Sequence, residues 1–382
     1  MRVAINLEQV LHDAPGGIGR YSAALARLLP DTPAGAVVAP FVAWHKKSAI
    51  ARAWNEWELD TVGYPAVIPV PRPALYDAWH TIGAPTPWAL APALRGVDLV
   101  HAPSVAVPPT EQVPLVVTVH DAAPVVMPEA FTRRGRWFHA RGFAAAAKRA
   151  TVVITVSEFA RDEIAAHTLI PADRIRVVPN GVDLGVAADA DVAAVRVRYG
   201  LGDAPFILWA GVLQPRKNVG VLVDAFAKFV AAGDRSEVLV LAGPDGWLDP
   251  GIDAALDALG GRVRRLGAVP PAELRALYRG AAAFALPSRH EGFGLPLLEA
   301  MAQGTPTIAA DIGSLREVGG GIARYVPVDD VAGWADTLAE VVDLDLVARA
   351  TIAEAARLLA AEFSWRACVE RTRDVYEEAL GG

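Results

Sequence analysis

The chain has 382 residues, of which 53% are hydrophobic and 21% charged, with a formal net charge of −7 and one cysteine. This composition excludes a disordered chain, and the length indicates two domains or one large one. The lone Cys368 excludes an internal disulfide and a cysteine-rich zinc site, and the net acidity argues against nucleic acid as a partner. No apolar run is long enough for a membrane span and no signal peptide opens the chain, so we expect a cytoplasmic location.

Short β-branched runs alternate with alanine-rich helical stretches in the first half of the chain. Strands are predicted at Val3–Leu7, Ala36–Val42, Leu99–His101, Leu115–Val119, Val152–Val156 and Ile175–Val178. A helix is expected around Arg136–Arg149, and another opens near Ser157, an N-cap candidate without a capping box.

The second half repeats this alternation. Strands are predicted at Phe206–Val212, Val238–Ala242, Arg262–Leu266, Ala282–Leu286 and Thr307–Ala309. Helices are predicted at Val219–Ala232, Asp253–Leu259, Pro271–Arg279 and Leu295–Ala302. Apolar strands alternating with helices predict an α/β protein with two open, mostly parallel, doubly wound sheets.

Turn chemistry at Pro179-Asn180-Gly181 marks the junction between the two halves. We expect an N-terminal domain over 1–182, a linker over 183–203 and a C-terminal domain over 204–362. The tail at 363–382 is predicted to form a separate amphipathic helix that crosses back to the N-terminal domain. Two such domains with a cleft between them would bind ligand at the carboxyl ends of their strands.

A glycine loop, Gly16-Gly17-Ile18-Gly19, follows the first strand and opens a helix. Such glycines let the backbone approach a phosphate at a helix N-terminus. The loop partly matches a dinucleotide-binding fingerprint, but the acid required after the second strand is missing, because the chain reads Ala43-Trp44-His45-Lys46 there. A tight turn that simply needs glycine is the alternative.

Two adjacent cations, Arg216 and Lys217, follow the first strand of the second half, with Asn218 as the expected N-cap of the next helix. A forked guanidinium, an ammonium and helix N–H groups suit an anion. Lys217 is one of only five lysines in the chain. A solvated pair of cations is the alternative interpretation.

Two carboxylates surround a glycine-containing helix start at Pro287–Ala300. Glu291 is expected in the loop before the helix, and Glu299 just inside it, because Pro296 suits the first helical turn. Carboxylates beside an anion site are useful only if they bind hydroxyls, and sugar and ribose hydroxyls are the natural partners. Two solvated acids at a helix start are the alternative.

His120 stands at the end of a predicted strand and is followed by Asp121. A histidine at the carboxyl end of a strand can hydrogen-bond a ligand in a cleft, although a lone histidine is also a common structural residue.

Two further features bear on an acceptor. Half of the ten tryptophans fall within residues 44–88, and they form either a sugar-stacking or apolar acceptor surface or the docking faces of amphipathic helices. They are Trp44, Trp54, Trp57, Trp79 and Trp88. A basic run at 133–149 would attract an anionic membrane or a lipid phosphate, or is a solvated helix face.

Together these motifs resemble the retaining glycosyltransferases of family 4, which have the GT-B fold. The resemblance runs from about residue 3 to residue 378 and rests on six motifs in order. They are Gly16–Tyr21, His120-Asp121, Val156–Phe159, Val178–Asp183, Pro215–Asn218 and the pair Glu291 and Glu299. The chain is most similar to a subgroup with many GDP-mannose-dependent mannosyltransferases.

The resemblance implies roles for five residues near the reacting groups. Arg216 and Lys217 would hold the donor diphosphate and stabilise the leaving nucleotide. Glu291 would hold hydroxyls of the donor sugar, and His120 would contact that sugar from the N-terminal domain. Gly17 would place its backbone against the diphosphate or the sugar.

The remaining donor-binding residues implied by the resemblance follow strands of the C-terminal half. Glu299 would bind the ribose hydroxyls, and Val269 would lie beside the base. The helix start that holds the donor comprises Gly292, Phe293, Gly294 and Leu295. With Glu273 as the only nearby acid, Val269-Pro270-Pro271 gives weak support for guanine, so a UDP- or dTDP-sugar stays open as the alternative donor.

No metal and no separate cofactor are expected. The two Asp-x-Asp pairs, Asp189 with Asp191 and Asp343 with Asp345, fall in the predicted linker and in a C-terminal helix rather than after a cleft strand. The expected partners are a nucleotide-sugar donor and a sugar or glycolipid acceptor, with peripheral contact to the inner membrane face as an open option. The chain is expected to be a monomer or a homodimer. A non-catalytic nucleotide-binding module and an NAD-dependent oxidoreductase are the distant alternatives.

Overall fold

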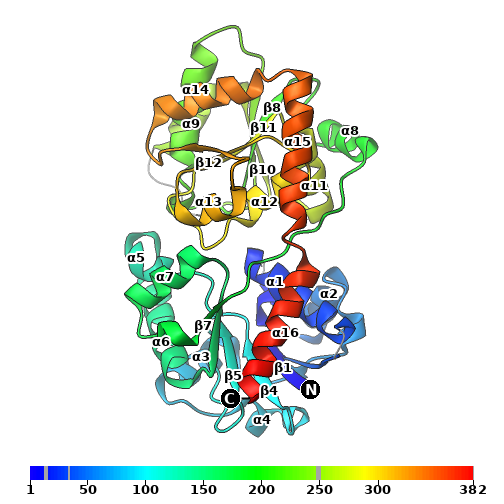
Figure 1. The fold of residues 1–382 in the computed structure, drawn as a ribbon, viewed down its shortest axis with the longest axis vertical. Helices are drawn as coiled ribbons and strands as arrows, with labels where there is room; N and C mark the ends of the chain where they lie inside the picture. Colours follow the sequence, from blue (N-terminus) through cyan, green and yellow to red (C-terminus); the bar gives the residue numbers. More distant parts are fainter. Residues whose placement is uncertain (13–15, 33–34, 247–250, 382) are drawn as a thin grey trace. The chain divides into compact units, whose positions relative to one another are not determined.

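The computed structural model describes residues 1–12, 16–32, 35–246 and 251–381. The chain forms two compact units. Unit 1 comprises Met1–Gly181 together with the C-terminal segment from Trp365, and unit 2 comprises Val182–Ser364. Each unit is an open parallel sheet with helices packed against it (Figure 1).

The sheet of unit 1 has, within the described residues, seven parallel strands in the order β3-β2-β1-β4-β5-β6-β7. The strands are β1 (Arg2–Asn6), β2 (Val37–Val42), β3 (Ala66–Val67), β4 (Leu99–Ala102), β5 (Leu115–Thr118), β6 (Val152–Thr155) and β7 (Ile175–Val177). The helices are α1 (Gly16–Leu28), α2 (Lys47–Glu56), α3 (Arg72–Thr81), α4 (Pro87–Leu90), α5 (Ala123–Val126), α6 (Arg133–Arg149), α7 (Glu158–His167) and α16 (Trp365–Gly381).

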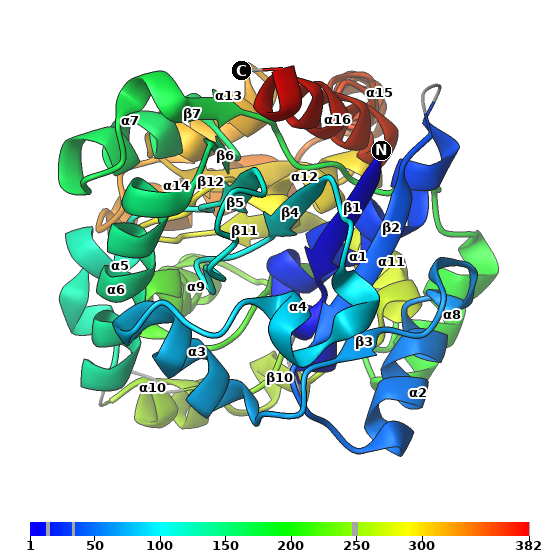
Figure 2. The same cartoon turned by 90° about the horizontal axis from the view of Figure 1, so that it is seen from below.

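Helices cover both faces of this sheet, which explains why its central strands are almost continuously apolar. One buried cluster joins strand residues to α1, α2 and α16, and it includes Tyr21, Trp54 and Tyr376. The other joins strand residues to α3, α6 and α7, and it includes Trp79 and Phe143. Figure 2 shows α16 on one side of these strands and α3 and α6 on the other.

The sheet of unit 2 has six described parallel strands in the order β10-β9-β8-β11-β12-β13. The strands are β8 (Phe206–Ala210), β9 (Val238–Ala242), β10 (Val263–Gly267), β11 (Ala283–Leu286), β12 (Thr307–Ala310) and β13 (Arg324–Val326). The helices are α8 (Asp189–Arg198), α9 (Val219–Ala231), α10 (Ile252–Leu259), α11 (Pro271–Gly280), α12 (Leu295–Ala302), α13 (Gly313–Gly319), α14 (Val331–Val342) and α15 (Leu346–Ala361).

Both sheets reverse their strand order at one point, between β1 and β4 in unit 1 and between β8 and β11 in unit 2. In an open parallel sheet, the carboxyl ends of the two strands at such a reversal flank a crevice in which ligands bind. The doubly wound fold expected from the sequence is confirmed, and the topology directs attention to the loops that follow β8 and β11.

The segment 183–203, predicted as a linker, is part of unit 2 and contains α8. This helix packs against α11, and Asp189 forms an ion pair with Arg279 at 2.5 Å. The linker prediction was therefore wrong over this stretch. Its small and acidic residues give α8 only one buried side chain, Val195, so the sequence shows little helical periodicity.

The predicted C-terminal helix corresponds to α16, which lies in unit 1 and packs against α1. Cys368 is buried on its inner face. The Tyr376 hydroxyl lies 2.6 Å from Nδ1 of His101 on β4. The last helix is thus part of unit 1, where it contacts β5 and β6.

Candidate functional site

The cation pair of unit 2 lies directly after β8. The chain leaves this strand and forms a single 3-10 turn, Pro215–Lys217, before α9 begins at Val219. Lys217 is buried, with 9% of its surface exposed. Asn218 occupies the N-cap position with a left-handed φ of +53°, but its side chain donates to the carbonyl of Val328 at 3.0 Å. Asn218 is thus the N-cap residue, as predicted, but its side chain does not cap the helix.

Glu291 lies after β11, the neighbour of β8, and its carboxylate meets both cations. Oε1 accepts hydrogen bonds from Nζ of Lys217 at 2.6 Å and from the hydroxyl of Ser288 at 2.7 Å. Oε2 accepts from Arg216 at 3.2 Å, and Arg216 also donates to the carbonyl of His290 at 2.8 Å. Two motifs about 75 residues apart thus form one cluster at the reversal point of the sheet.

The electrostatics of this cluster keep Glu291 ionised. Burial would raise the pKa of its carboxyl, but the charges of Lys217 and Arg216, with hydrogen bonds from Lys217 and Ser288, lower that pKa to about 2. Two cations and one carboxylate leave the cluster with a net charge of about +1. A partly buried site with one excess positive charge favours an anionic ligand.

The start of α12 is shaped by Gly294. This residue has a φ of +102°, and a Cβ at its position would overlap Cδ2 of Leu315, whose side chain is buried. A side chain is therefore excluded on two grounds. The neighbouring Phe293 packs its ring against Phe363 with centroids 5.9 Å apart, so its side chain belongs to the core of unit 2. The segment Gly292–Leu295 is buried and leads into α12, where the N–H groups of Leu297 and Leu298 both donate to the carbonyl of Gly294.

Glu299 and Val269 occupy different places around the sheet. Glu299 is half-buried in α12, and its Oε2 accepts a hydrogen bond from the hydroxyl of Tyr278 on α11 at 3.0 Å. Val269 is half-buried in the loop between β10 and α11. Because β9 separates β10 from β8, Val269 follows a strand two positions from the one that leads to Lys217.

The candidate residues of unit 1 also follow strands of their own sheet. Gly17 is exposed in the first turn of α1, which follows β1. His120 follows β5, and its Nε2 donates to the carbonyl of Pro103 at 2.9 Å. Burial lowers the pKa of His120, so the neutral ring is favoured at neutral pH. With Nε2 carrying the proton, Nδ1 is left as a hydrogen-bond acceptor.

A buried hydrogen-bond chain beneath His120 was not foreseen. The Tyr21 hydroxyl lies 2.9 Å from Oγ1 of Thr118, which lies 2.8 Å from Nε2 of His101. The ring of Tyr21 meets that of His120 edge-on at 5.3 Å. The alternation of side chains along β5 could have predicted that Thr118 points into the interior of unit 1. Nothing in the sequence indicates that Thr118 lies beside His101.

Ser288 and Tyr278 are further contacts of the site that sequence reasoning missed. Ser288 stands three residues before Glu291 in the same loop, and this short spacing could have predicted a contact between their side chains. Tyr278 lies on a different helix from Glu299, and only the packing of α11 on α12 brings them together.

The two Asp-x-Asp pairs lie at the ends of helices and do not follow strands of the sheet. Asp189 and Asp191 lie in the first turn of α8. Asp343 is the C-cap of α14 and Asp345 the N-cap of α15, so this pair spans a helix junction and does not lie within one helix as expected. Within the described ranges, no three His, Cys, Asp or Glu residues are grouped as a metal site.

The tryptophan-rich stretch is mostly structural. Trp54 and Trp79 are buried in the two cores of unit 1, and Trp57 and Trp88 pack partly against them. Trp44, after β2, is 53% exposed. On α6, the guanidinium of Arg134 lies 4.8 Å from the ring centroid of Trp137 on a largely exposed surface. No helix among the described residues has the length and apolar character to cross a membrane.

Comparisons with known sequences match both units. A model of "Glycosyltransferase Family 4" matches residues 15–186, and a model of "Glycosyl transferases group 1" matches residues 204–343. The O-antigen chain mannosyltransferase B of Escherichia coli is 31% identical over 267 residues, which cover 69% of this chain and 70% of that enzyme. The D-inositol 3-phosphate glycosyltransferase of Nocardia farcinica is 36% identical over 219 residues, and the match covers 54% of this chain and about half (48%) of that enzyme.

Solved structures share the fold over nearly the whole chain. The Anabaena HepE protein in complex with UDP and glucose superimposes with a TM-score of 0.72 at 20% identity, covering 99% of this chain and 100% of that one. The sucrose-phosphate synthase of Thermosynechococcus elongatus gives a TM-score of 0.73 at 20% identity, covering 100% and 99%. These matches confirm the GT-B fold.

Proposed function

The chain belongs to the family 4 glycosyltransferases of the GT-B fold, and we propose that it transfers a hexose from a nucleotide diphosphate sugar with retention of the anomeric configuration. The proposed donor is GDP-mannose. Its support is the similarity to the Escherichia coli enzyme, whose name describes a mannosyltransferase. The proposed acceptor is a sugar, a lipid-linked saccharide or a natural product.

The observation that carries this proposal is the cluster of Arg216, Lys217 and Glu291 at the strand-order reversal of unit 2. When the bond between the anomeric carbon and the diphosphate breaks, negative charge develops on the departing nucleoside diphosphate. Fixed cations and helix N–H groups stabilise that charge, and removing one such donor typically costs about 3 kcal/mol of barrier. Arg216 and Lys217 supply the cations, and the backbone of Gly294 and Leu295, where α12 begins, supplies the N–H groups.

The other residues take supporting roles in the proposed mechanism. Glu299 binds the ribose hydroxyls, and Val269 lies beside the base. Glu291 and the backbone of Gly292–Leu295 hold the hydroxyls of the donor sugar. From unit 1, Nδ1 of neutral His120 accepts a hydrogen bond from a sugar hydroxyl, and the backbone of Gly17 faces the diphosphate or the sugar.

We propose that the reaction needs neither a metal ion nor a separate cofactor, because the two cations and the helix N-terminus already meet the charge of the leaving group. EDTA should leave the rate of sugar transfer or of donor hydrolysis unchanged. Loss of activity in EDTA, restored by a divalent cation, would contradict this part of the proposal.

We propose a cytoplasmic enzyme, monomeric or homodimeric, that does not bind nucleic acid. The exposed cations of α6, together with Trp137, are the candidate surface for peripheral contact with the inner membrane face. Flotation with anionic and neutral vesicles, compared between the wild-type protein and an Arg133→Glu, Arg134→Glu variant, tests that contact.

Thermal shifts with GDP, UDP, dTDP, ADP and NAD test the proposed donor. A nucleotide at about 100 times its Kd stabilises a protein by about 2.7 kcal/mol. We expect GDP to stabilise the wild-type chain, Lys217→Met to lose most of this shift, and the exposed Lys228→Met control to retain it. A shift with UDP or dTDP instead supports the alternative donor, and a shift with NAD alone overturns the proposal.

A further inference from the structure

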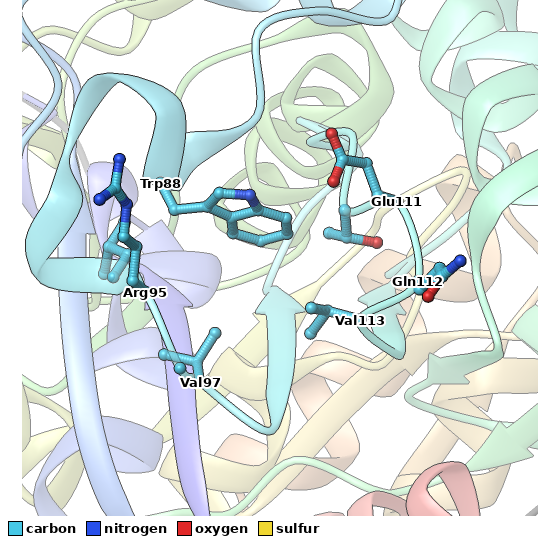
Figure 3. Close-up of a pocket in the computed structure, with 9 residues that line it drawn as sticks. Trp88, Arg95, Val97, Glu111, Gln112 and Val113 are labelled. Atoms are coloured by element: carbon cyan, nitrogen blue, oxygen red, sulfur yellow. The ribbon is translucent and has the colours of Figure 1, made fainter.

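A cavity of about 530 Å³ lies in unit 1 at the amino ends of β4 and β5 (Figure 3). It is lined by the segment that precedes β4 and by the segment that precedes β5. Figure 3 shows the indole of Trp88 extending towards the loop that carries Glu111 and Gln112, with Arg95 on the other side. Leu94, Val97 and Val113 supply its apolar lining.

This cavity is separate from the residues assigned to transfer. Val113 lines the cavity and precedes the amino end of β5, whereas His120 follows the carboxyl end of the same strand. At about 3.3 Å per residue, the seven steps between them span roughly 20 Å of sheet. The cavity therefore lies at the edge of the sheet opposite to the one at which GT-B domains bind their substrates.

Thr110 adds a hydroxyl group to the lining of this cavity. Thr110 is 4% exposed and lines the cavity. None of the described residues forms a hydrogen bond with the Thr110 hydroxyl, which is not among the fully buried unpaired atoms and is therefore accessible from the cavity. This hydroxyl can therefore donate a hydrogen bond to a ligand in the cavity and accept one from it.

The loop beside Thr110 holds a carboxylate in an unfavourable backbone conformation. Val113 N–H donates to the carbonyl of Thr110 at 2.9 Å and closes a four-residue turn. Glu111, the first central residue, has a φ of +53°, a conformation that favours glycine. Strained positions of this kind are concentrated at ligand-binding sites. A carboxylate therefore stands at the rim of the cavity where glycine would fit the backbone better.

We propose that this cavity is a second, non-catalytic binding site for a neutral saccharide. The face of Trp88 suits the C–H face of a sugar ring, and the carboxylate of Glu111, the amide of Gln112 and the hydroxyl of Thr110 suit its hydroxyls. Arg95 balances the charge of Glu111, so the rim carries no net charge and favours a neutral polyol over a phosphate. The volume is within the usual range for small-ligand pockets and fits one or two sugar rings.

The role of this site rests on the proposed function, since a glycosyltransferase with a saccharide acceptor or product gains from holding it at a second point. Simultaneous contact at two linked sites raises the apparent affinity without a new contact at the catalytic site. We therefore expect the site to lower the KM for long saccharide acceptors and to leave the KM for short ones unchanged.

Saccharide binding tests the proposal directly. The probes are methyl α-mannoside and a mannotriose, measured by saturation-transfer NMR with GDP present to occupy the donor site. We expect Thr110→Val and Glu111→Gly each to weaken binding about fivefold or more, as for the loss of one hydrogen-bonding group. Neither change should unfold the protein, because valine keeps the shape of threonine and glycine relieves the strained φ.

Glu58→Gly is the matched control. Glu58 has the same φ of +53°, lies in unit 1 and is exposed, but it pairs with Arg27 away from the cavity. Glu58→Gly should bind the saccharides as the wild type does. If the wild type binds neither probe, or if Thr110→Val and Glu111→Gly bind as tightly as Glu58→Gly, the proposal is overturned.

The same variants separate this proposal from the proposed function. Thr110→Val and Glu111→Gly should retain the thermal shift with GDP and the hydrolysis of the donor. If no nucleoside diphosphate raises the melting temperature of the wild type, the proposed function fails. Saccharide binding at Thr110 is measured separately and is not decided by that result.

Discussion

The ammonium of Lys217 lies 2.6 Å from Oε1 of Glu291, and both residues are buried. The pair joins the loops that follow two neighbouring strands, β8 and β11, and Arg216 contributes a second contact at 3.2 Å. The same pair therefore has two effects: it links two loops of unit 2, and it fixes a cation at the point where a donor diphosphate is proposed to bind.

Loss of Lys217 should destabilise the protein. Removing one member of a buried ion pair leaves the other charge uncompensated and typically costs 3–5 kcal/mol. Because Arg216 still contacts Glu291, we expect the lower end, about 3 kcal/mol, for Lys217→Met in urea unfolding at pH 7. The double variant Lys217→Met, Glu291→Gln should be destabilised by less than the sum of the single changes. Simple additivity, or an equal loss in the exposed Lys228→Met control, would contradict this coupling.

The acid stability of the chain should depend on Glu291. Its pKa is lowered from 4.5 to about 2 in the folded protein, so its contribution is complete above pH 4.5 and is lost as the pH falls towards 2. A difference of this size corresponds to about 3 kcal/mol. Unfolding free energies measured from pH 7 down to pH 3 should fall more steeply for the wild type than for Glu291→Gln. Parallel curves would show that the carboxylate is not held in its ionised form.

The neutral form of His120 should be the active one. Burial lowers its pKa below the usual 6.5, so activity should be lost as the pH falls through this lowered value and should be constant above it. We expect His120→Ala to lower donor hydrolysis about tenfold and to remove this acidic limb. The exposed His167→Ala should retain both the rate and the limb. An acidic limb that persists in His120→Ala belongs to another group.

Sequence patterns predicted most of the buried strands and several helices, because the spacing of their apolar residues matches the positions that are buried. Leu295–Ala302 was predicted as a helix with the observed bounds, since Pro296 marks its first turn. The short edge strands β3 and β13 were missed, because two or three residues are too few to show a period. The helix α8 was missed for a similar reason, as its residues are mostly exposed.

The candidate site was predictable as a set of motifs but not as a set of contacts. The sequence placed Lys217 and Glu291 in separate loops with separate roles, and only the neighbouring positions of β8 and β11 bring them to 2.6 Å. The left-handed φ of Asn218 likewise directs its side chain to Val328 instead of the helix N-terminus, which no local pattern indicates.

Glu299 should affect nucleotide affinity more than turnover. If its carboxylate binds the ribose hydroxyls, Glu299→Ala should raise the Kd for the nucleoside diphosphate about tenfold. Tyr278→Phe removes the hydroxyl that donates to Oε2 at 3.0 Å and should cause a smaller loss of the same kind. Titration calorimetry of both variants, with Asp336→Ala on α14 as an exposed control, measures the difference. An unchanged Kd in Glu299→Ala would remove this residue from the donor site.

The last helix should be fixed to unit 1 by Tyr376. Its hydroxyl lies 2.6 Å from Nδ1 of His101, both residues are fully buried, and burial lowers the pKa of His101 to about 3. The ring is therefore neutral and depends on hydrogen bonds to satisfy its two nitrogens. Tyr376→Phe leaves Nδ1 buried and unpaired, which should cost about 1–3 kcal/mol in urea unfolding. Tyr64→Phe, at a residue that is 58% exposed, should change stability by less than about 0.5 kcal/mol. Equal stabilities of the two variants would mean that α16 is held by its apolar contacts alone.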